Sequence, residues 1–218
     1  MTREERKKDI RIKRTRAFII AARQLLKEEP FEEISIRKIA DLAGMHNSTI
    51  YLYFSDAERL ITMASINEFS EYNQQLSELS RSSQDVYDIF FKVWYYSCIC
   101  SFSKADIFYN FFYGKYSDDL TSIMKEYYEL FPEELKMHSD YLESMYFGKN
   151  ISERCLQLMR PLAGLPGVKI SEENLRLIND VVDYSFRGFL FKAKTNPDVS
   201  WEELTADFIK ILHFFVDE

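Results

Sequence analysis

Long apolar segments, paired cysteines and an apolar N-terminal segment are all missing from this sequence. No apolar run approaches the roughly 20 residues that a membrane-spanning helix needs. The first nine residues are mostly charged, whereas a secretory signal has an apolar centre. Three cysteines, Cys98, Cys100 and Cys155, do not make a disulfide framework, and a reducing compartment is the simpler interpretation. We therefore expect a cytoplasmic protein with no membrane partner.

Motifs for catalysis and metal binding are missing as well. The sequence has no GxSxG elbow, no glycine-rich phosphate loop and no HExxH pair. Its three histidines are widely separated, which does not predict a metal site. His138 and Asp140 lack a paired nucleophile, and His213, between Leu212 and Phe214, is typical of a packed histidine. We therefore expect no catalytic residue, no metal and no cofactor, and a protein that is not an enzyme.

The alternation of apolar and polar residues that is typical of strands does not occur over a useful length, and no internal repeat is present. Apolar residues recur instead at helical spacing. The 218 residues, 46% of them apolar, suffice for one or two domains with a substantial core. The sequence therefore predicts an all-α fold. We expect a first helix that follows the charged N-terminal residues and ends before Pro30. Beyond the first 55 residues we expect helices at about 56–80, 86–101, 106–113, 118–130, from 132 to 148, from about 150 to 161, at 171–194 and at 201–216.

The stretch from residue 35 to residue 60 has the pattern of two short helices. Ser35 is a suitable N-cap, and Gly44 suits the sharp exit from a first helix. One helical face between them is apolar: Ile36, Ile39, Ala40 and Ala43. In the second helix Ile50 and Phe54 are expected to face inward, so the polar residues around them stay exposed. This pattern predicts a helix-turn-helix whose second helix enters a DNA major groove, although spacing alone also fits an ordinary helical hairpin.

Charge is distributed unevenly along the chain. The net charge is −7, yet residues 1–27 carry ten basic and three acidic residues. Residues 61–218 carry 15 basic and 25 acidic residues. Because local charge governs attraction to phosphates, the basic N-terminal end is compatible with DNA binding. We expect residues 1–9 to form a mobile basic arm next to the DNA.

Many positions between about residue 10 and residue 60 agree, in order and without gaps, with a known family. They are Thr15-Arg16, Ala21-Ala22, Leu25-Leu26, Phe31, Ser35-Ile36, Ile39-Ala40, Ala43-Gly44-Met45, Thr49-Ile50-Tyr51, Tyr53-Phe54 and Leu60. This run resembles the N-terminal domain of the tetracycline-repressor (TetR) family. The sequence departs from that family at three positions. The family usually has Ser or Thr in place of His46, Gly in place of Ser48, and Lys in place of Ala57.

The resemblance implies a helix-turn-helix domain at residues 10–60 and a larger helical domain for effector binding and dimerisation at 61–218. Its contact positions, together with the place of these residues on or beside the second helix, predict which side chains meet DNA. Tyr51 and Tyr53 are expected on the DNA backbone, and Arg37, Asn47 and Thr49 near bases or phosphates. The full predicted DNA-binding set is Arg37, His46, Asn47, Ser48, Thr49, Tyr51 and Tyr53.

The middle of the chain is rich in aromatic residues. Residues 90–147 contain 18 of them, and nine are Tyr, whose hydroxyl needs a partner when it is buried. A packed core can account for this density, but so can a ligand cavity lined by rings and a few hydroxyls. In the resembled family the inducer lies between the middle helices. The predicted pocket residues are Trp94, Tyr95, Cys98, Phe108, Phe112 and Tyr127.

The charges near this region suggest a class of ligand. Few basic residues are close in sequence, because Lys92, Lys104 and Lys115 are expected at the surface. The acidic residues Asp106 and Glu126 leave room for a cationic compound, which can also stack on an aromatic ring. We therefore expect a small apolar or aromatic effector, uncharged or cationic.

The last two expected helices carry apolar and small residues that suit a four-helix bundle between two copies. The predicted dimer interface is Val181, Val182, Tyr184, Ser185, Gly188, Phe189, Phe208, Ile211, Leu212 and Phe215. The alternative is that this face packs only inside its own subunit.

The combined interpretation is a DNA-binding transcriptional repressor that acts as a homodimer on double-stranded operator DNA and is released by a small-molecule effector. Two alternatives stay open. One is a regulator of this family that answers to a protein partner, and the other is a helical binding protein or enzyme for an apolar compound.

Overall fold

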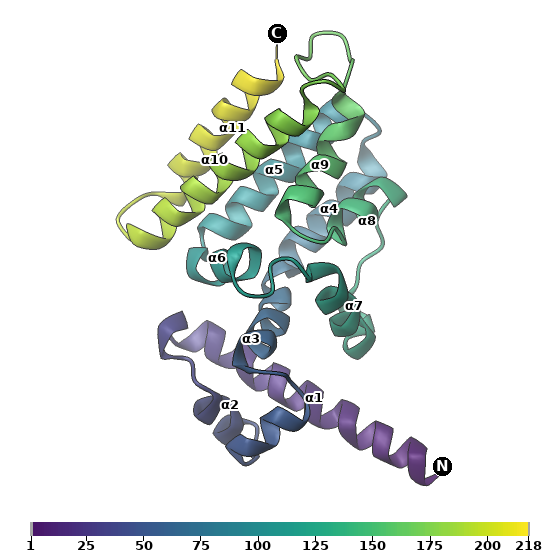
Figure 1. Cartoon of the computed structure of the whole chain (residues 1–218), viewed down its shortest axis with the longest axis vertical. Helices are drawn as coiled ribbons and strands as arrows, with labels where there is room; N and C mark the ends of the chain where they lie inside the picture. Colours follow the sequence, from purple (N-terminus) through teal and green to yellow (C-terminus); the bar gives the residue numbers. More distant parts are fainter. Residues whose placement is uncertain (1, 218) are drawn as a thin grey trace.

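The computed structural model describes residues 2–217, and every regular element in this range is a helix (Figure 1). The α-helices are α1 (Arg3–Glu28), α2 (Ile36–Leu42), α3 (Ala57–Ser65), α4 (Ser70–Ser82), α5 (Val86–Phe102), α6 (Ala105–Tyr113), α7 (Leu120–Leu130), α8 (Asp140–Tyr146), α9 (Ile151–Met159), α10 (Leu175–Thr195) and α11 (Trp201–Val216). The 3-10 helices are η1 (Phe31–Glu33), η2 (Asn47–Leu52), η3 (Ile66–Phe69), η4 (Pro132–Glu134) and η5 (Arg160–Leu162). The predicted all-α fold is therefore confirmed.

The N-terminal unit is built on α1, which is longer than the sequence pattern predicted. Thr2 and Glu5 form a capping box, and Asp9 and Lys13 pair at 2.8 Å one turn later. These local contacts stabilise the helix from Arg3 onward. Residues 3–9, which were predicted to form a mobile arm, are therefore helical and make the first turns of α1. These turns project beyond the rest of the N-terminal unit (Figure 1). Met1 lies outside the described residues.

The core of this unit lies where α1 crosses α2, η2 and α3. Phe18 of α1 is fully buried and packs edge-to-face on Phe54, with ring centroids 6.2 Å apart. Ile39 of α2 and Ile50 of η2 are also fully buried. The apolar spacing read from the sequence therefore predicted this core correctly.

The connection to the larger unit runs through α3, η3 and α4. The N-cap of α3 is Asp56, whose Oδ1 accepts from the Arg59 N–H at 2.9 Å, so the helix begins at Ala57, close to the expected start. The expected single helix at 56–80 contains a 3-10 turn, η3, at residues 66–69. Helical winding nevertheless continues through this turn, so the two units are joined by one nearly continuous element (Figure 1).

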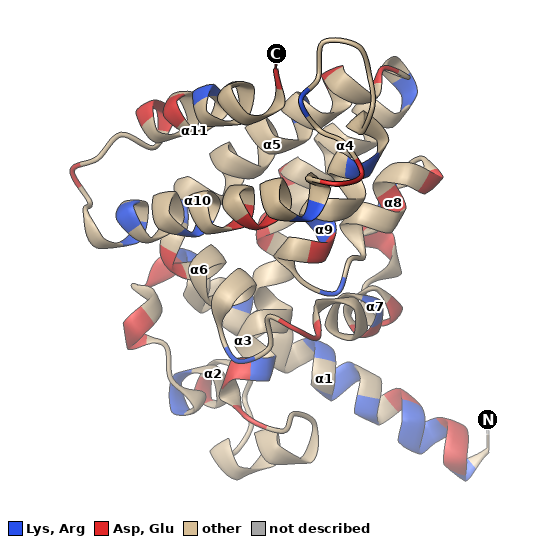
Figure 2. Ribbon diagram, turned by 45° about the horizontal axis from the view of Figure 1, so that its top comes forward, with Lys and Arg blue, Asp and Glu red and all other residues tan. Residues whose placement is uncertain are grey.

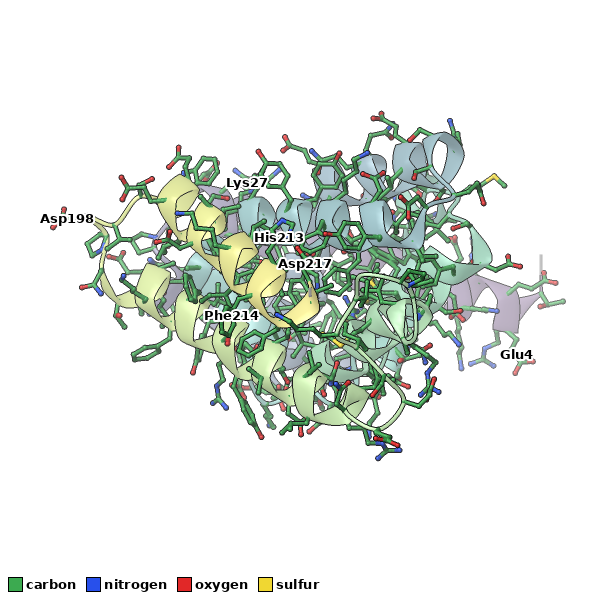
Figure 3. All side chains as sticks on the ribbon, turned by 90° about the horizontal axis from the view of Figure 1, so that it is seen from above. Glu4, Lys27, Asp198, His213, Phe214 and Asp217 are labelled. Atoms are coloured by element: carbon green, nitrogen blue, oxygen red, sulfur yellow. The ribbon has the colours of Figure 1, made fainter. Side chains whose placement is uncertain are left out.

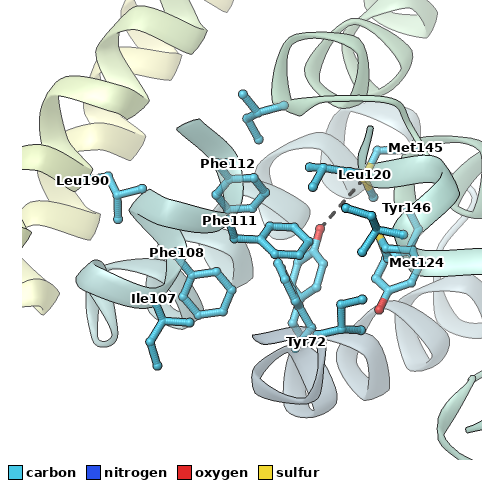
Figure 4. Close-up of a cluster of buried hydrophobic side chains, with 14 of the residues drawn as sticks. Tyr72, Ile107, Phe108, Phe111, Phe112, Leu120, Met124, Met145, Tyr146 and Leu190 are labelled. Atoms are coloured by element: carbon cyan, nitrogen blue, oxygen red, sulfur yellow. Dashed lines mark hydrogen bonds between the residues drawn. The ribbon is translucent and has the colours of Figure 1, made fainter. Parts of the chain in front are cut away.

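The C-terminal unit surrounds α5, which contacts α4, α6, α10 and α11. Trp94 of α5 packs between Phe186 of α10 and Phe208 of α11, with ring centroids 5.3 Å from each. A second group of rings lies around α6 (Figure 4), where Phe69 meets Phe108 at 4.7 Å. Much of the aromatic density between residues 90 and 147 therefore forms ordinary core.

Other expected helices differ at their ends. Pro132 opens only the single 3-10 turn η4, and the chain reaches α8 at Asp140 after an irregular segment. Helix α10 begins at Leu175, four residues later than expected. Helix α11 begins at Trp201 after the Ser200 cap and ends at Val216, as the sequence predicted.

Candidate DNA-binding surface and effector cavity

Helix α2 and η2 are joined by the tight turn that the sequence predicted. The Ser35 Oγ accepts from the Lys38 N–H at 3.3 Å at the start of α2. Gly44 has a φ of +66°, a conformation that side chains other than glycine rarely adopt. The Met45 N–H then closes the helix end on the Ala40 carbonyl at 2.9 Å. This turn fixes η2 against the core of the N-terminal unit.

Helix η2 carries the exposed part of the predicted DNA-binding set. Ile50 and Phe54 point into the core and are 0% and 3% exposed, whereas Tyr51 and Leu52 are 59% and 66% exposed. Asn47 and Ser48 are also exposed, and Thr49 is partly buried. The element is a 3-10 helix and not the expected α-helix. Asn, Ser and Thr are poor interior residues of α-helices because their side chains compete for backbone groups, which fits the tighter turn.

His46 and Ser48, two departures from the resembled family, contact each other. The His46 Nδ1 accepts from the Ser48 N–H at 3.3 Å and lies 2.7 Å from the Ser48 Oγ. His46 therefore caps η2 as Ser or Thr would. Both residues are exposed at the start of η2, and their side chains are hydrogen-bonded to each other.

Tyr53 lies at the junction of η2 and α1. Its hydroxyl accepts from Arg14 at 3.4 Å, and the Arg11 guanidinium lies 5.6 Å from its ring centroid. Helix α1 continues this basic edge (Figure 2), because Arg3, Arg6, Lys7 and Lys8 are all exposed on its first turns. The predicted residue Arg37 is exposed on α2 and faces Asp41 at 3.8 Å, beside an open hollow between α2 and η2. Basic and polar side chains thus gather on α1, α2 and η2.

Helix α1 also contacts the C-terminal unit through two arginines. The Arg16 Nη2 donates to Glu133 at 2.7 Å, and the Arg23 Nη1 donates to Glu134 at 2.8 Å. The Tyr127 hydroxyl donates to Glu134 at 2.5 Å and also contacts the Arg23 guanidinium. Burial raises the pKa of Tyr127, so this hydroxyl stays protonated. Tyr127 was predicted to line the ligand pocket, but it belongs to this contact between the units.

A second contact joins the start of α3 to the segment between α6 and α7. Asp56 Oδ2 accepts from the Lys115 ammonium and from the Tyr116 hydroxyl, each at 2.6 Å. Although burial opposes its charge, these two donors and the Arg59 N–H lower the pKa of Asp56 to about 2. Arg59 itself pairs with Glu126 of α7. The N-terminal unit is therefore held by charged contacts at two separate points.

A small cavity of about 30 Å³ lies inside the C-terminal unit. Its walls come from η3, α4, α5, α6, α8 and α9. Two of the predicted pocket residues, Trp94 and Phe112, line it. Cys98 and Phe108 are fully buried outside its lining, and Tyr95 is 48% exposed on the outer face of α5. Tyr95 is therefore a wrong prediction, because its side chain faces away from the core.

Several polar wall residues were missed by reasoning from the sequence. They are Tyr72, Ser97, Ser101 and Arg154. Tyr72 and Arg154 lie outside the aromatic stretch at 90–147 in which the pocket was sought. Arg154 is 5% exposed although it carries a charge, and its position on α9 gave no local signal of burial. Cys155 also reaches this wall, and burial raises the pKa of its thiol well above the ordinary value.

Helices α10 and α11 lie side by side on the outside of the C-terminal unit (Figure 1). An apolar stripe, hereafter the α10 stripe, runs along α10 at spacings of four and three residues: Leu177, Val181, Tyr184, Gly188 and Phe191. Leu177, Tyr184 and Phe191 are 68%, 70% and 51% exposed. Leu177 and Phe191 were not among the predicted interface residues.

The predicted interface on α11 needs correction. Phe208 and Leu212 are 0% exposed within their own subunit, as is Val182 of α10, so none of them has surface left for a partner. Phe189 packs on Phe208 with ring centroids 5.7 Å apart. Ile211 and Phe215 are partly exposed.

The residues at 213 and 214 of α11 leave the helix on different sides (Figure 3). His213 stacks on Phe91 with ring centroids 4.0 Å apart, in agreement with its predicted packing role, and its Nδ1 lies 2.7 Å from Asp217. Phe214, which was not predicted, is 71% exposed.

Membrane-crossing helices and metal clusters are both absent from the described residues. Among residues 2–217 no helix has the length and apolarity needed to cross a membrane. Within the same range no three His, Cys, Asp or Glu side chains come together in a way that could hold a metal ion.

The comparisons with known proteins agree with this geometry. Residues 18–62 match the family described as bacterial regulatory proteins, tetR family. No curated protein sequence is significantly similar to the chain. A structure of Thermus thermophilus FadR, a TetR-family transcriptional repressor in complex with lauroyl-CoA, is 14% identical with a TM-score of 0.58, covering 91% of this chain and 92% of its own. A TetR transcriptional regulator from Rhodococcus sp. RHA1 is 13% identical with a TM-score of 0.55, covering 93% and 94%.

A third structure, the fatty acid degradation regulator FadR from Bacillus halodurans, is 15% identical with a TM-score of 0.50, covering 91% of this chain and 93% of its own. At these identities the structures show a shared fold. The family match covers the helix-turn-helix that the geometry of α2 and η2 defines. Residues 18–62 therefore match the helix-turn-helix domain of the tetR family of bacterial regulatory proteins, and the chain as a whole shares the fold of these solved TetR regulators.

Proposed function

We propose that the protein is a transcriptional repressor that binds operator DNA as a homodimer. The observation that carries this proposal is the exposed polar and phenolic surface of η2 beside a fully buried Ile50. In a helix-turn-helix the second helix enters the major groove, and the neighbouring side chains hold phosphates. Residues 10–60 act as the DNA-binding domain, and Arg37, Asn47, Thr49, Tyr51 and Tyr53 contact DNA, with His46 and Ser48 at the start of η2.

The α10 stripe supports the homodimer. Apolar side chains that are more than half exposed along one face of a 21-residue helix lose contact with water when a second copy covers them. Gly188 sits in the middle of this stripe, and nothing lies within 4 Å of where its Cβ would be. A partner helix can therefore approach closely there. Two copies would place two η2 elements about 34 Å apart, one helical turn of DNA.

The C-terminal unit, residues 61–218, serves as the effector domain in this proposal. The FadR structure from Thermus thermophilus holds lauroyl-CoA, so a related fold accommodates a small molecule in that protein. In this chain Arg16 and Arg23 connect α1 to η4, and the chain continues from η4 to α8, which lines the cavity. An effector that fits one arrangement of these helices better than another changes DNA affinity through this link.

A gel shift on the DNA upstream of the protein's own gene tests the proposal. We expect Tyr51→Ala to weaken binding at least tenfold while the far-UV circular dichroism stays unchanged, because Tyr51 is 59% exposed. Ile50→Asp should instead unfold the N-terminal unit, because it buries an unpaired charge. Leu52→Asp, two residues later and 66% exposed, is the matched control for folding. A Tyr51→Ala variant that keeps wild-type affinity would reject this DNA-binding surface.

A further inference from the structure

Arg154 of α9 is a buried cation without a carboxylate partner among the described residues. It is 5% exposed, and no Asp or Glu oxygen lies within 4 Å of it in this part of the chain. Its Nε donates to the Gly148 carbonyl at 3.2 Å, and its Nη2 lies 2.6 Å from the Met124 thioether sulfur. Buried arginines are normally paired, because removing a guanidinium from water is costly. A carbonyl and a thioether leave most of its five N–H donors without a strong acceptor.

The same cavity presents further donors that lack acceptors. The Trp94 Nε1 and the Ser101 Oγ are both buried, and neither has a hydrogen-bond partner among the described residues. Both residues line the cavity beside Arg154, as does Tyr72, whose hydroxyl lies 3.9 Å from the Met145 sulfur. An indole N–H and a guanidinium can only donate, and the two hydroxyls can donate as well. Three separate helices, α4, α5 and α9, therefore contribute residues with hydrogen-bond donors to the lining of one cavity.

The remaining walls are apolar. They are Phe69, Val93, Phe112, Met145, Ile151 and Leu158. Three of the lining residues, Phe112, Met145 and Tyr72, are labelled in Figure 4 among the buried side chains of the surrounding core. The arrangement combines a cation and several hydrogen-bond donors with an apolar lining. A cationic compound would instead need an anionic group or hydrogen-bond acceptors.

We propose that this cavity binds an organic anion, a carboxylate on an apolar body, with Arg154 as the group that pairs its charge. The inference rests on the proposed function, since it names the class of effector. A carboxylate offers two oxygens in the fork geometry that a guanidinium matches, and it accepts the free protons of Trp94 and Ser101. This proposal differs from the sequence-based expectation of an uncharged or cationic effector, which did not consider Arg154 because that residue lies outside the aromatic stretch.

The present volume of about 30 Å³ holds little more than water. The body of the ligand must therefore displace side chains, and Met145 is the most adaptable of the lining residues. Helices α8 and α9 carry Met145 and Arg154, so binding shifts these helices against α5. This rearrangement of α8 and α9 is how ligand binding in the cavity changes the conformation of the C-terminal unit.

Binding can be measured without DNA on a Trp201→Phe background, in which Trp94 is the only tryptophan. The probes are benzoate, 4-phenylbutanoate and decanoate, each beside its matched alcohol and its matched ammonium compound. We expect at least one carboxylate to raise the melting temperature and change Trp94 fluorescence, with a Kd at least tenfold lower than that of its alcohol. Equal or tighter binding of the alcohols or amines, or no response to any carboxylate, would overturn the proposal.

Variants of Arg154 then separate an anion-binding role from a packing role. In Arg154→Met the preference for carboxylate over alcohol should disappear, while in Arg154→Lys it should persist in weakened form. A folded Arg154→Met variant that keeps the full preference overturns the assignment. If Arg154→Met does not fold, Ser101→Ala decides: the proposal expects weaker carboxylate binding with unchanged alcohol binding, and unchanged carboxylate binding counts against it.

The DNA arm of the experiment distinguishes this inference from the proposed function. Carboxylate binding together with a gel shift that the carboxylate reverses supports both. Carboxylate binding by a protein that shifts no DNA supports the anion site and rejects the repressor. A gel shift in a protein that ignores every carboxylate supports the repressor and rejects the anion site.

Discussion

At the scale of single residues, Asp56 has two roles that can be separated. Its Oδ1 caps α3, and its Oδ2 accepts from Lys115 and Tyr116 of the other unit. Asn is also a good N-cap, so Asp56→Asn keeps the cap and removes only the charge. The pKa of Asp56 is lowered from 3.8 to about 2, which means that the charged contacts stabilise the fold fully above about pH 4.

We therefore expect Asp56→Asn to lower the free energy of unfolding at pH 7 by about 1 kcal/mol, the usual size for a partly exposed ion pair with hydrogen bonds. This difference should shrink as the pH falls from 4 toward 2, because the wild-type carboxylate then becomes protonated. Urea unfolding at a series of pH values measures it. A deficit that stays constant from pH 7 to pH 2.5 would show that the charge has no part in it. Lys115→Gln should reproduce the neutral-pH loss.

Residues whose role depends on sequence neighbours could be predicted, and residues whose role depends on distant neighbours could not. Ser35, Gly44 and Ile50 are fixed by a cap, a turn and an apolar spacing, all of which are visible within ten residues. Arg154 and Tyr127 are different, because their partners lie on other helices. An arginine with ordinary polar neighbours in sequence carries no sign that the fold will bury it.

At the scale of whole elements, too, features set by nearby residues could be predicted and features set by distant packing could not. The period of apolar residues fixed which face of α2 and α11 is buried, and the Ser200 cap fixed where α11 begins. The pattern could not tell which apolar residues face a partner and which face the subunit's own core. Phe208 and Leu212 share one helical face with Ile211 and Phe215, yet only the first two are completely buried within the subunit. Only the packing of α11 on α5 decides this.

The α10 stripe leads to a prediction about assembly. Tyr184→Glu together with Phe191→Glu places two carboxylates on a surface that is exposed in the subunit, at 70% and 51%, so the subunit should still fold. If a second copy covers this stripe, the charges would be buried without partners and the dimer should dissociate. Sedimentation velocity should show a monomer for this variant.

The control for assembly uses the same chemistry elsewhere. Leu135→Glu with Met137→Glu changes two exposed apolar residues, 39% and 83% exposed, away from α10 and α11. This variant should sediment like the wild type. An intact dimer of the Tyr184 and Phe191 variant would place the interface outside the α10 stripe.

At the scale of the whole molecule, charge is separated between the two units. Residues 1–27 carry a net charge of +7, and residues 61–218 carry −10. The net negative charge of residues 61–218 disfavours contact with phosphates, and the basic residues that attract them are concentrated on α1. The basic residues at the start of α1 lie on a formed helix, and a helix holds them at fixed positions along one edge of the DNA-binding domain.

This separation predicts how salt affects DNA binding. Replacing Arg3, Arg6, Lys7 and Lys8 with Gln should make the dependence of log K on log salt concentration shallower by roughly 0.9 for each phosphate that is no longer neutralised. Preference between operator and unrelated DNA should not change, because phosphate contacts carry no sequence information directly. The matched control replaces four exposed lysines of the C-terminal unit, Lys136, Lys149, Lys169 and Lys210, with Gln. Titrations between 50 and 200 mM salt compare the two variants, and an equal slope in both would exclude the first turns of α1 from the DNA-binding surface.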